Sequence, residues 1–256
     1  MTLICHQFSY NDDNYGFLLH DPKTKQTAAI DAGCAKSYEA ALAETGYQLS
    51  CIFITHHHWD HADGLAALKK ATNAHVIGPK NTKESIAALL DETVQDGDRI
   101  RFGSQLIDVI ATPGHTLDMM NYYNAEAGYL FSGDSLFTLG CGRLFEGDGP
   151  MMWDSLSKLL ALPDETIIYS AHEYALANAA FAATIDPENT ELQDRIALIE
   201  QARAKGVPTV PSRLAEEKAT NPFCRADDAK IRAHLGMSDE SDEAVFTEIR
   251  RRKDVF

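Results

Sequence analysis

The ten residues from Thr55 to Gly64, THHHWDHADG, include four histidines and two aspartates. Imidazole and carboxylate groups together suit zinc, iron or manganese ions. His56 and His58 are two residues apart, so in extended backbone their side chains point the same way. Asp60 and His61 follow where the apolar run CIFIT gives way to a helix-like run. The spacing predicts a strand end that presents His56 and His58 to one metal ion, and Asp60 and His61 to a second ion beside it.

Three further candidate ligands lie later in the chain, each directly after an apolar run that reads as a strand. They are His115 in TPGHT, Asp134 in LFSGDS and His172 in IIYSAH. Sheet proteins commonly build their sites on loops of this kind. A carboxylate at Asp134 would bridge both ions with its two oxygens. The predicted ligands are His56, His58, His115 and Asp134 for the first ion, and Asp60, His61, His172 and Asp134 for the second.

A purely structural interpretation of these residues is weaker. Four histidines packed with two aspartates and no metal would leave charges and donors to satisfy. Asp134 by itself reads equally well as a turn residue after a strand. The other six candidates, which all follow strand-like runs, favour the metal interpretation for Asp134 as well.

The chemistry that this donor set predicts is metal-assisted hydrolysis. Two metal ions roughly 3.5–4 Å apart share a hydroxide, and a metal lowers the pKa of bound water to about 7. Either ion also polarises a carbonyl and stabilises the oxyanion that forms. The chain has no GxSxG motif and no Rossmann or P-loop fingerprint. We assign the catalytic role to Asp60 and Asp134 and expect two divalent ions per chain, zinc first, with iron or manganese as alternatives.

Composition limits the classes of partner. The chain has 256 residues, 45% of them hydrophobic and 24% charged, and a formal net charge of −15. So acidic a surface disfavours nucleic acid and anionic membranes as partners. No apolar run reaches the roughly 18 residues that cross a bilayer, and the N-terminal residues lack the pattern of a signal peptide. We expect a cytoplasmic monomer that acts on a small molecule. The five cysteines are scattered without CxxC spacing, which argues against a disulfide framework.

Strand-like and helix-like runs alternate up to His172, and helix-like runs follow, punctuated by Pro208 and Pro211. Gly46 is a predicted helix stop. The pattern predicts a mixed α/β catalytic domain over residues 1–172 and a helical, substrate-binding domain over residues 173–256.

The segments THHHWDHADG, TPGHT, FSGDS and SAHEY together resemble the metallo-β-lactamase superfamily. That resemblance implies an α+β fold, an αββα sandwich, followed here by a smaller all-helical C-terminal domain. Within the superfamily the chain resembles glyoxalase II, the hydroxyacylglutathione hydrolases, through DDNYGFLL, GCGRLFEG, NPFCR and the final RRRKDVF. The resemblance implies hydrolysis of S-D-lactoylglutathione to glutathione and D-lactate, the second step of methylglyoxal detoxification.

The resemblance also implies which residues hold the glutathione part of the substrate. These are Arg143, Phe145, Tyr174, Arg250 and Lys253. Some members of the family carry tyrosine where this chain has Phe145, so here we expect packing without a hydroxyl donor. The basic run RRRK reads, by itself, equally well as a solvated helix end that complements the helix dipole.

Two departures from the family pattern leave the ligands in place. Asp63 replaces a common glycine, and LDMMNYY follows TPGHT where Gly-His is often found. The alternative within the fold is a persulfide dioxygenase with a single iron, which should lack the long helical domain and its basic pair. A phosphodiesterase or ribonuclease is disfavoured by the net charge, antibiotic hydrolysis by the helical domain, and a non-catalytic binding protein by the complete ligand set.

Overall fold

The computed structural model describes residues 2–256, and the chain folds as two compact units. The first unit holds the chain up to Ala111 together with Asp118–Gly133. The second unit holds Thr112–Leu117 together with Asp134–Phe256. The short segment Thr112–Leu117 therefore belongs to the same unit as the C-terminal half, although both of its flanks belong to the first unit.

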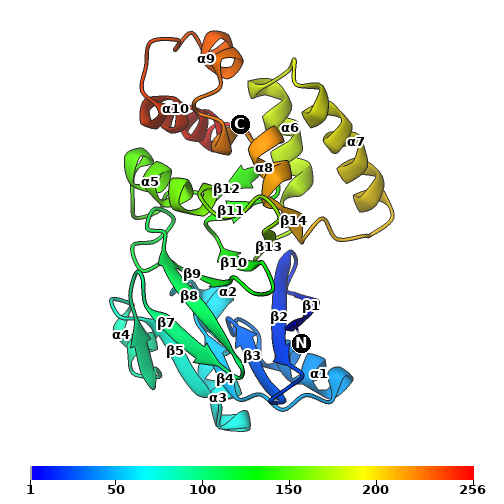
Figure 1. Cartoon of the computed structure of the whole chain (residues 1–256), viewed down its shortest axis with the longest axis vertical. Helices are drawn as coiled ribbons and strands as arrows, with labels where there is room; N and C mark the ends of the chain where they lie inside the picture. The colour runs from blue at the N-terminus through cyan, green and yellow to red at the C-terminus, as the bar shows by residue number, and fades with distance from the viewer. Residues whose placement is uncertain (1) are drawn as a thin grey trace. The chain divides into compact units, whose positions relative to one another are not determined.

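A six-stranded sheet forms the centre of the first unit, with its strands in sequence order (Figure 1). The strands are β1 (Ile4–Tyr10), β2 (Asn14–Asp21), β3 (Gln26–Ile30), β4 (Cys51–Phe53), β5 (His75–Pro79) and β6 (Glu92–Val94). β1, β2 and β3 pair antiparallel, whereas β3 to β6 pair parallel. The parallel half is covered on both faces, which explains the continuous apolar runs in its sequence.

Four antiparallel strands pack against one face of that sheet. They are β7 (Arg99–Phe102), β8 (Gln105–Ala111), β9 (Met120–Asn124) and β10 (Tyr129–Gly133). Phe17 lies 5.6 Å from Phe131 between ring centroids, and Phe53 lies 5.2 Å from Tyr122. These aromatic pairs fill the space between the two layers of strands.

Helices cover the other face of the central sheet. They are α1 (Ala35–Thr45), α2 (Trp59–Ala62), α3 (Leu65–Thr72) and α4 (Glu84–Ala87). Tyr38 of α1 and Leu68 of α3 join Ile52 and Val76 of the strands in one buried cluster. α1 ends at Gly46, whose φ of 71° is left-handed, so the predicted helix stop is confirmed.

The second unit is mostly helical. Its strands are the hairpin β11 (Leu136–Phe137) and β12 (Gly140–Cys141), and the antiparallel pair β13 (Ile167–Ser170) and β14 (Ser212–Arg213). Its helices are α5 (Gly149–Leu160), α6 (Ala175–Ile185), α7 (Thr190–Ala204), α8 (Leu214–Thr220), α9 (Ala229–Leu235), α10 (Asp242–Asp254) and a 3₁₀ turn at Pro222–Cys224. α6 lies beside α7, and α10 lies beside α5 (Figure 1).

Small and aromatic side chains explain these helix pairs. Ala179 and Ala182 of α6 let α7 approach closely, where Leu192 is fully buried. Phe246 of α10 packs on Trp153 of α5 with 5.8 Å between ring centroids. Because β14 interrupts the helices after His172, the expectation that this region is entirely helical is wrong for two residues.

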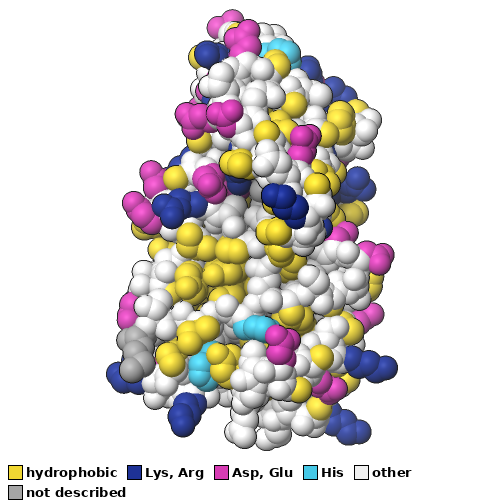
Figure 2. Space-filling model, turned by 90° about the vertical axis from the view of Figure 1, so that its right-hand side faces the viewer, with side chains coloured by type: hydrophobic (Ala, Val, Ile, Leu, Met, Phe, Trp, Pro, Cys, Tyr) yellow, Lys and Arg dark blue, Asp and Glu magenta, His cyan; other side chains and the backbone are white. Residues whose placement is uncertain are grey.

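Charged side chains are spread over the surface. Figure 2 shows one face, on which acidic and basic side chains lie singly among apolar ones rather than in a basic stripe. No helix in the described part of the chain, residues 2–256, is long and apolar enough to span a bilayer.

Candidate metal centre

The predicted metal ligands fall into two sets, one in each compact unit. The first ligand group comprises His56, His58, Asp60 and His61, and it lies in the first unit. The second ligand group comprises His115, Asp134 and His172, and it lies in the second unit.

The first ligand group follows β4 directly. The chain stays extended through His58 and then turns into the single-turn helix α2. His56 Nε2 lies 3.1 Å from His58 Nδ1, so the i, i+2 spacing does bring these two imidazoles together. The short helix brings His61 round to the same place, with its ring 4.1 Å from the ring of His56. Asp60 Oδ2 lies 3.4 Å from His61 Nε2, and four donor side chains therefore meet in one loop.

Asp31, directly after β3, fixes this loop through hydrogen bonds. It is not among the residues predicted from the sequence. Its buried carboxylate accepts hydrogen bonds from the Thr55 backbone N–H at 2.8 Å and from the Thr55 hydroxyl at 2.9 Å. Its Oδ2 lies 2.7 Å from His61 Nδ1. A carboxylate in this place fixes the imidazole tautomer, so that Nδ1 carries the proton and Nε2 is the ligand atom. In the sequence, the signal for this role is an aspartate directly after an apolar strand. In the structure, the Asp31 backbone has a left-handed φ of 63°.

His57 and Trp59 lie between the predicted ligands in the sequence and differ in burial. His57 is buried, and its Nδ1 lies 2.9 Å from Asp118 Oδ1. Thr82 donates to the other oxygen of Asp118 at 2.6 Å. Asp118 belongs to the LDMMNYY segment that departs from the family pattern, so the departure supplies a partner for His57. Trp59, by contrast, is 66% exposed.

The second ligand group converges from three loops. His115 Nε2 lies 3.3 Å from Asp134 Oδ2, and His172 Nε2 lies 3.3 Å from Asp134 Oδ1. All three side chains are buried. Each carboxylate oxygen of Asp134 thus faces a different imidazole, which is the arrangement that a bridging carboxylate needs.

Neutral contacts orient the second ligand group. His115 Nδ1 donates to the Arg143 backbone carbonyl at 2.7 Å, which directs Nε2 toward Asp134. Gly142 permits this approach, because a Cβ there would lie 2.0 Å from the Asp134 carbonyl oxygen. The ring of Tyr174 stacks on His172 at 4.7 Å between centroids and an interplanar angle of 2°.

Of the five residues expected to hold glutathione, three have exposed side chains. Phe145 is 61% exposed, and its ring centroid lies 5.3 Å from that of His115. The Arg143 guanidinium is exposed and lies 6.0 Å from the Phe145 ring centroid. Tyr174 is 37% exposed although it stacks on His172. Predicted ligands and predicted substrate residues therefore lie beside one another within this unit.

Arg250 and Lys253, in the last turns of α10, are more enclosed. Arg250 is 5% exposed; it donates to Asp254 at 2.7 Å and to the Cys141 carbonyl at 3.1 Å. In this conformation the Arg250 guanidinium is paired with Asp254, so it would bind a substrate carboxylate only after that ion pair breaks. The Lys253 ammonium donates to the Ala177 carbonyl at 2.8 Å. Desolvation, and secondly the Arg250 charge, lower the pKa of Lys253 to about 8.

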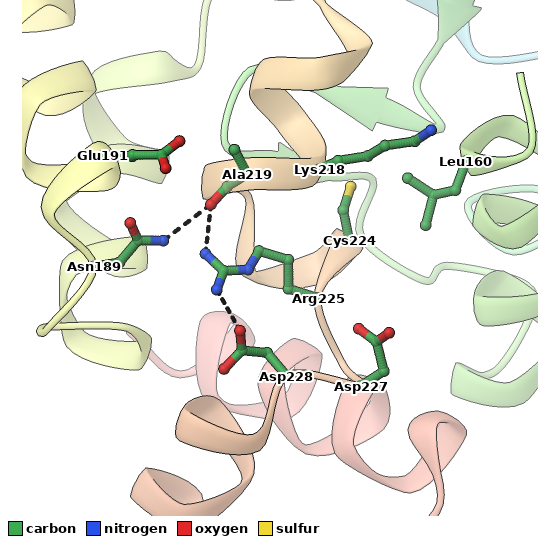
Figure 3. A pocket seen from close by; sticks show the side chains of 9 residues that line it. All are labelled: Leu160, Asn189, Glu191, Lys218, Ala219, Cys224, Arg225, Asp227 and Asp228. Atoms are coloured by element: carbon green, nitrogen blue, oxygen red, sulfur yellow. Dashed lines mark hydrogen bonds and ion pairs between the residues drawn. The ribbon is translucent and has the colours of Figure 1, made fainter. Parts of the chain in front are cut away.

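A separate pocket of about 620 Å³ opens in the second unit (Figure 3). It is lined by Leu160, Asn189, Glu191, Lys218, Ala219, Cys224, Arg225, Asp227 and Asp228. Arg225 is paired with Asp228 at 2.5 Å, and Lys218 is paired with Asp164 at 2.5 Å. Its cations therefore already have anionic partners, and no predicted ligand lines it.

Comparison with known proteins supports the same assignment. Residues 17–172 match the family described as metallo-beta-lactamase superfamily, and residues 173–256 match hydroxyacylglutathione hydrolase C-terminus. A hydroxyacylglutathione hydrolase from Brucella anthropi is 52% identical over 98% of this chain and 96% of its own length. One from Bartonella tribocorum is 50% identical over 99% of this chain and all of its own.

Among solved structures, ETHE1 from Myxococcus xanthus superposes with a TM-score of 0.69 and 28% identity, covering 97% of this chain and 90% of that one. The sequence identity to the two hydrolases is much higher, 52% and 50% against 28%, over a similar share of the chain. The chain belongs to the hydroxyacylglutathione hydrolase family of the metallo-β-lactamase superfamily.

Proposed function

We propose that the protein hydrolyses the thioester bond of S-D-lactoylglutathione, giving glutathione and D-lactate. The observation that carries the proposal is the identity of about half of all residues with hydroxyacylglutathione hydrolases over the whole chain. The match includes the C-terminal region expected to hold glutathione. A persulfide dioxygenase with a single iron is disfavoured by the higher identity, 52% and 50%, with the hydrolases.

We further propose that the two ligand groups hold two divalent metal ions, most suitably zinc, with the ligand sets given by the sequence. Divalent metal binding follows from the superfamily, and the donor chemistry within each unit suits it. His61 Nδ1 is hydrogen-bonded to the Asp31 carboxylate, and His115 Nδ1 is hydrogen-bonded to the Arg143 carbonyl, so in each ring Nε2 is left to face a metal. Outer partners of this kind are typical of metal-binding histidines. When bound, the ions supply a nucleophile at neutral pH and polarise the thioester carbonyl.

In this proposal the protein's own residues position the ions and the substrate. Asp134 contributes one oxygen beside His115 and the other beside His172. Asp60 and His61 stay together because they share one short helix. A thiolate whose conjugate acid has a pKa of about 8.5 leaves without much help from a general acid, and the proposal requires no proton donor at the sulfur.

For the glutathione part, we propose that Arg143 meets a carboxylate, that Tyr174 offers its hydroxyl and that Phe145 provides an apolar surface. Lys253 adds a positive charge near the substrate carboxylate. Arg250 acts indirectly, because it pairs with Asp254, and the Asp254 carboxylate in turn lies 3.7 Å from Arg143 Nε. A charge-assisted pair between arginine and a carboxylate is the strongest of these contacts. We also propose that the enzyme acts as a cytoplasmic monomer.

The test follows hydrolysis of S-D-lactoylglutathione at the thioester absorbance, and oxygen consumption with glutathione persulfide, using one preparation. We expect rapid thioester hydrolysis and no oxygen uptake. Oxygen uptake without hydrolysis would overturn the proposal in favour of the dioxygenase. Leu198→Ala, at a position of α7 that is 65% exposed, serves as a control variant with unchanged turnover.

A further inference from the structure

The turn between β1 and β2 contacts one predicted ligand at two points. The Tyr10 hydroxyl donates to the backbone carbonyl of Asp60 at 2.8 Å. The Asn14 side-chain amide donates to Asp60 Oδ2 at 3.0 Å. Tyr10 and Asn14 are 4% and 3% exposed, so both hydrogen bonds are largely shielded from water.

The hairpin geometry explains why these two side chains reach the same residue. Tyr10 and Asn14 are directly opposite each other in the antiparallel pair, so their side chains leave the same face of the sheet. Asn11 lies in the turn with a left-handed φ of 50°, and its amide donates to Asn14 Oδ1 at 3.3 Å. That contact orients the Asn14 amide, so that its N–H₂ end faces Asp60.

The same oxygen, Asp60 Oδ2, lies 3.4 Å from His61 Nε2, and a carboxylate oxygen has lone pairs for both a hydrogen bond and a metal. We propose that Asn14 is a positioning residue for Asp60: its amide hydrogen-bonds Oδ2 and thereby fixes the carboxylate beside His61 for binding the second metal ion. This inference rests on the proposed function, since it requires Asp60 to be a ligand. Outer partners of metal ligands typically change metal affinity by about 10–100-fold when they are removed.

A merely structural role for Asn14 predicts something different. A buried amide that only stabilises the hairpin would lower the melting temperature without changing metal affinity. Asn124 offers a matched control in the same unit, because it is 1% exposed and donates to the Leu106 carbonyl at 2.9 Å. It also accepts from the Ala127 N–H at 2.7 Å. Both of these partners are backbone groups.

The experiment strips the full-length protein of metal and titrates zinc back against a chromophoric chelator, which yields the affinity of each ion. Asn14→Ala should weaken one of the two ions by about 10–100-fold and leave the other nearly unchanged. Asn14→Asp keeps the shape but loses the donor, so it should weaken the same ion at least as much. Asn124→Ala should leave both affinities at the wild-type value.

Two results would overturn the inference. One is wild-type affinity for both ions in folded Asn14→Ala and Asn14→Asp. The other is equal weakening in Asn124→Ala, which would trace the effect to general destabilisation. Asp60→Asn in the same titration separates the two proposals. If Asp60→Asn weakens one ion while the Asn14 variants do not, this inference alone fails. If Asp60→Asn binds both ions as the wild type does, the proposed ligand set fails with it.

Discussion

The two ligand groups are supported in different ways. The first group is contiguous in sequence, and a buried carboxylate, Asp31, and a buried amide, Asn14, hold it through polar contacts. The second group comes from three loops, and a backbone carbonyl, a stacked tyrosine and the close approach of Gly142 hold it. The first ligand group therefore depends mainly on charged and polar side-chain contacts, and the second depends mainly on close packing. Substitutions that alter only charge should affect the first group more, and substitutions that alter only volume should affect the second group more.

The largest effect is expected for Gly142→Ala, which tests the role of shape in the second group. The new methyl group would lie 2.0 Å from the Asp134 carbonyl oxygen and 3.1 Å from the His115 side chain. The Asp134 backbone must shift and the His115 side chain must adjust slightly, so we expect metal content to fall and kcat/KM to drop by about 100-fold. Gly206→Ala controls for general destabilisation, because its φ of 71° strains any added side chain although no atom lies within 4 Å. Near-normal turnover in Gly142→Ala would show that the loop accommodates the methyl group without displacing Asp134 or His115, and would contradict the dependence on close packing.

Asp31→Asn comes next and tests the role of charge in the first group. The amide keeps the shape but cannot accept from both Thr55 and His61 through two oxygens. We expect about 10–100-fold weaker binding of one zinc ion and a free energy of unfolding lower by about 1–3 kcal/mol. Metal titration and urea unfolding of the same variant measure the two effects. Unchanged zinc affinity would remove Asp31 from the metal site and leave it a structural role.

Tyr174 should show a smaller effect that depends on the variant. Tyr174→Phe keeps the ring stacked on His172, so metal content should be unchanged while KM rises. Tyr174→Ala removes the stacking as well, and an aromatic pair contributes about 0.5–1.5 kcal/mol. We therefore expect a further loss of kcat of about 2–13-fold. Equal kinetics in the two variants would mean that the ring contributes nothing beyond its hydroxyl.

The smallest effect concerns Lys253 and pH. Burial lowers the pKa of this amine to about 8, so the side chain is charged below that pH and loses its charge above it. Attraction for a glutathione carboxylate should therefore weaken as pH rises from 7 to 9, and KM should increase a few-fold. Lys253→Arg keeps its charge over this range and should show a flatter KM profile. Parallel profiles would exclude Lys253 from substrate binding.

The sequence predicted the fold class and the family well, because both depend on local patterns. The metallo-β-lactamase domain followed by a helical C-terminal region is confirmed by the family matches, as is the enzyme class. The domain boundary at residue 172 stays a prediction, as do the seven metal ligands. Strand ends were predictable since apolar runs stop abruptly at polar residues.

Long-range contacts were not predictable from local patterns. Asp31 and Asn14 are distant in sequence from the ligands they touch, and each alone reads as a turn or strand-end residue. α2 and α3 are separated at Asp63–Gly64, where a Cβ on Gly64 would lie 2.6 Å from the Ala32 carbonyl oxygen. Such a close approach of two backbones depends on tertiary packing. The burial of Arg250 also depends on tertiary packing, because its guanidinium donates to the distant Cys141 carbonyl.

The central proposal is that Asp134, whose two oxygens face His115 and His172, is a ligand of both metal ions. The most direct test counts metal ions per chain, by mass spectrometry of the purified protein, in the wild type and in Asp134→Ala, with thioester turnover measured on the same samples. We predict about two ions per wild-type chain, and a joint loss of metal and turnover in the variant. A variant that kept both ions and full turnover would contradict the account.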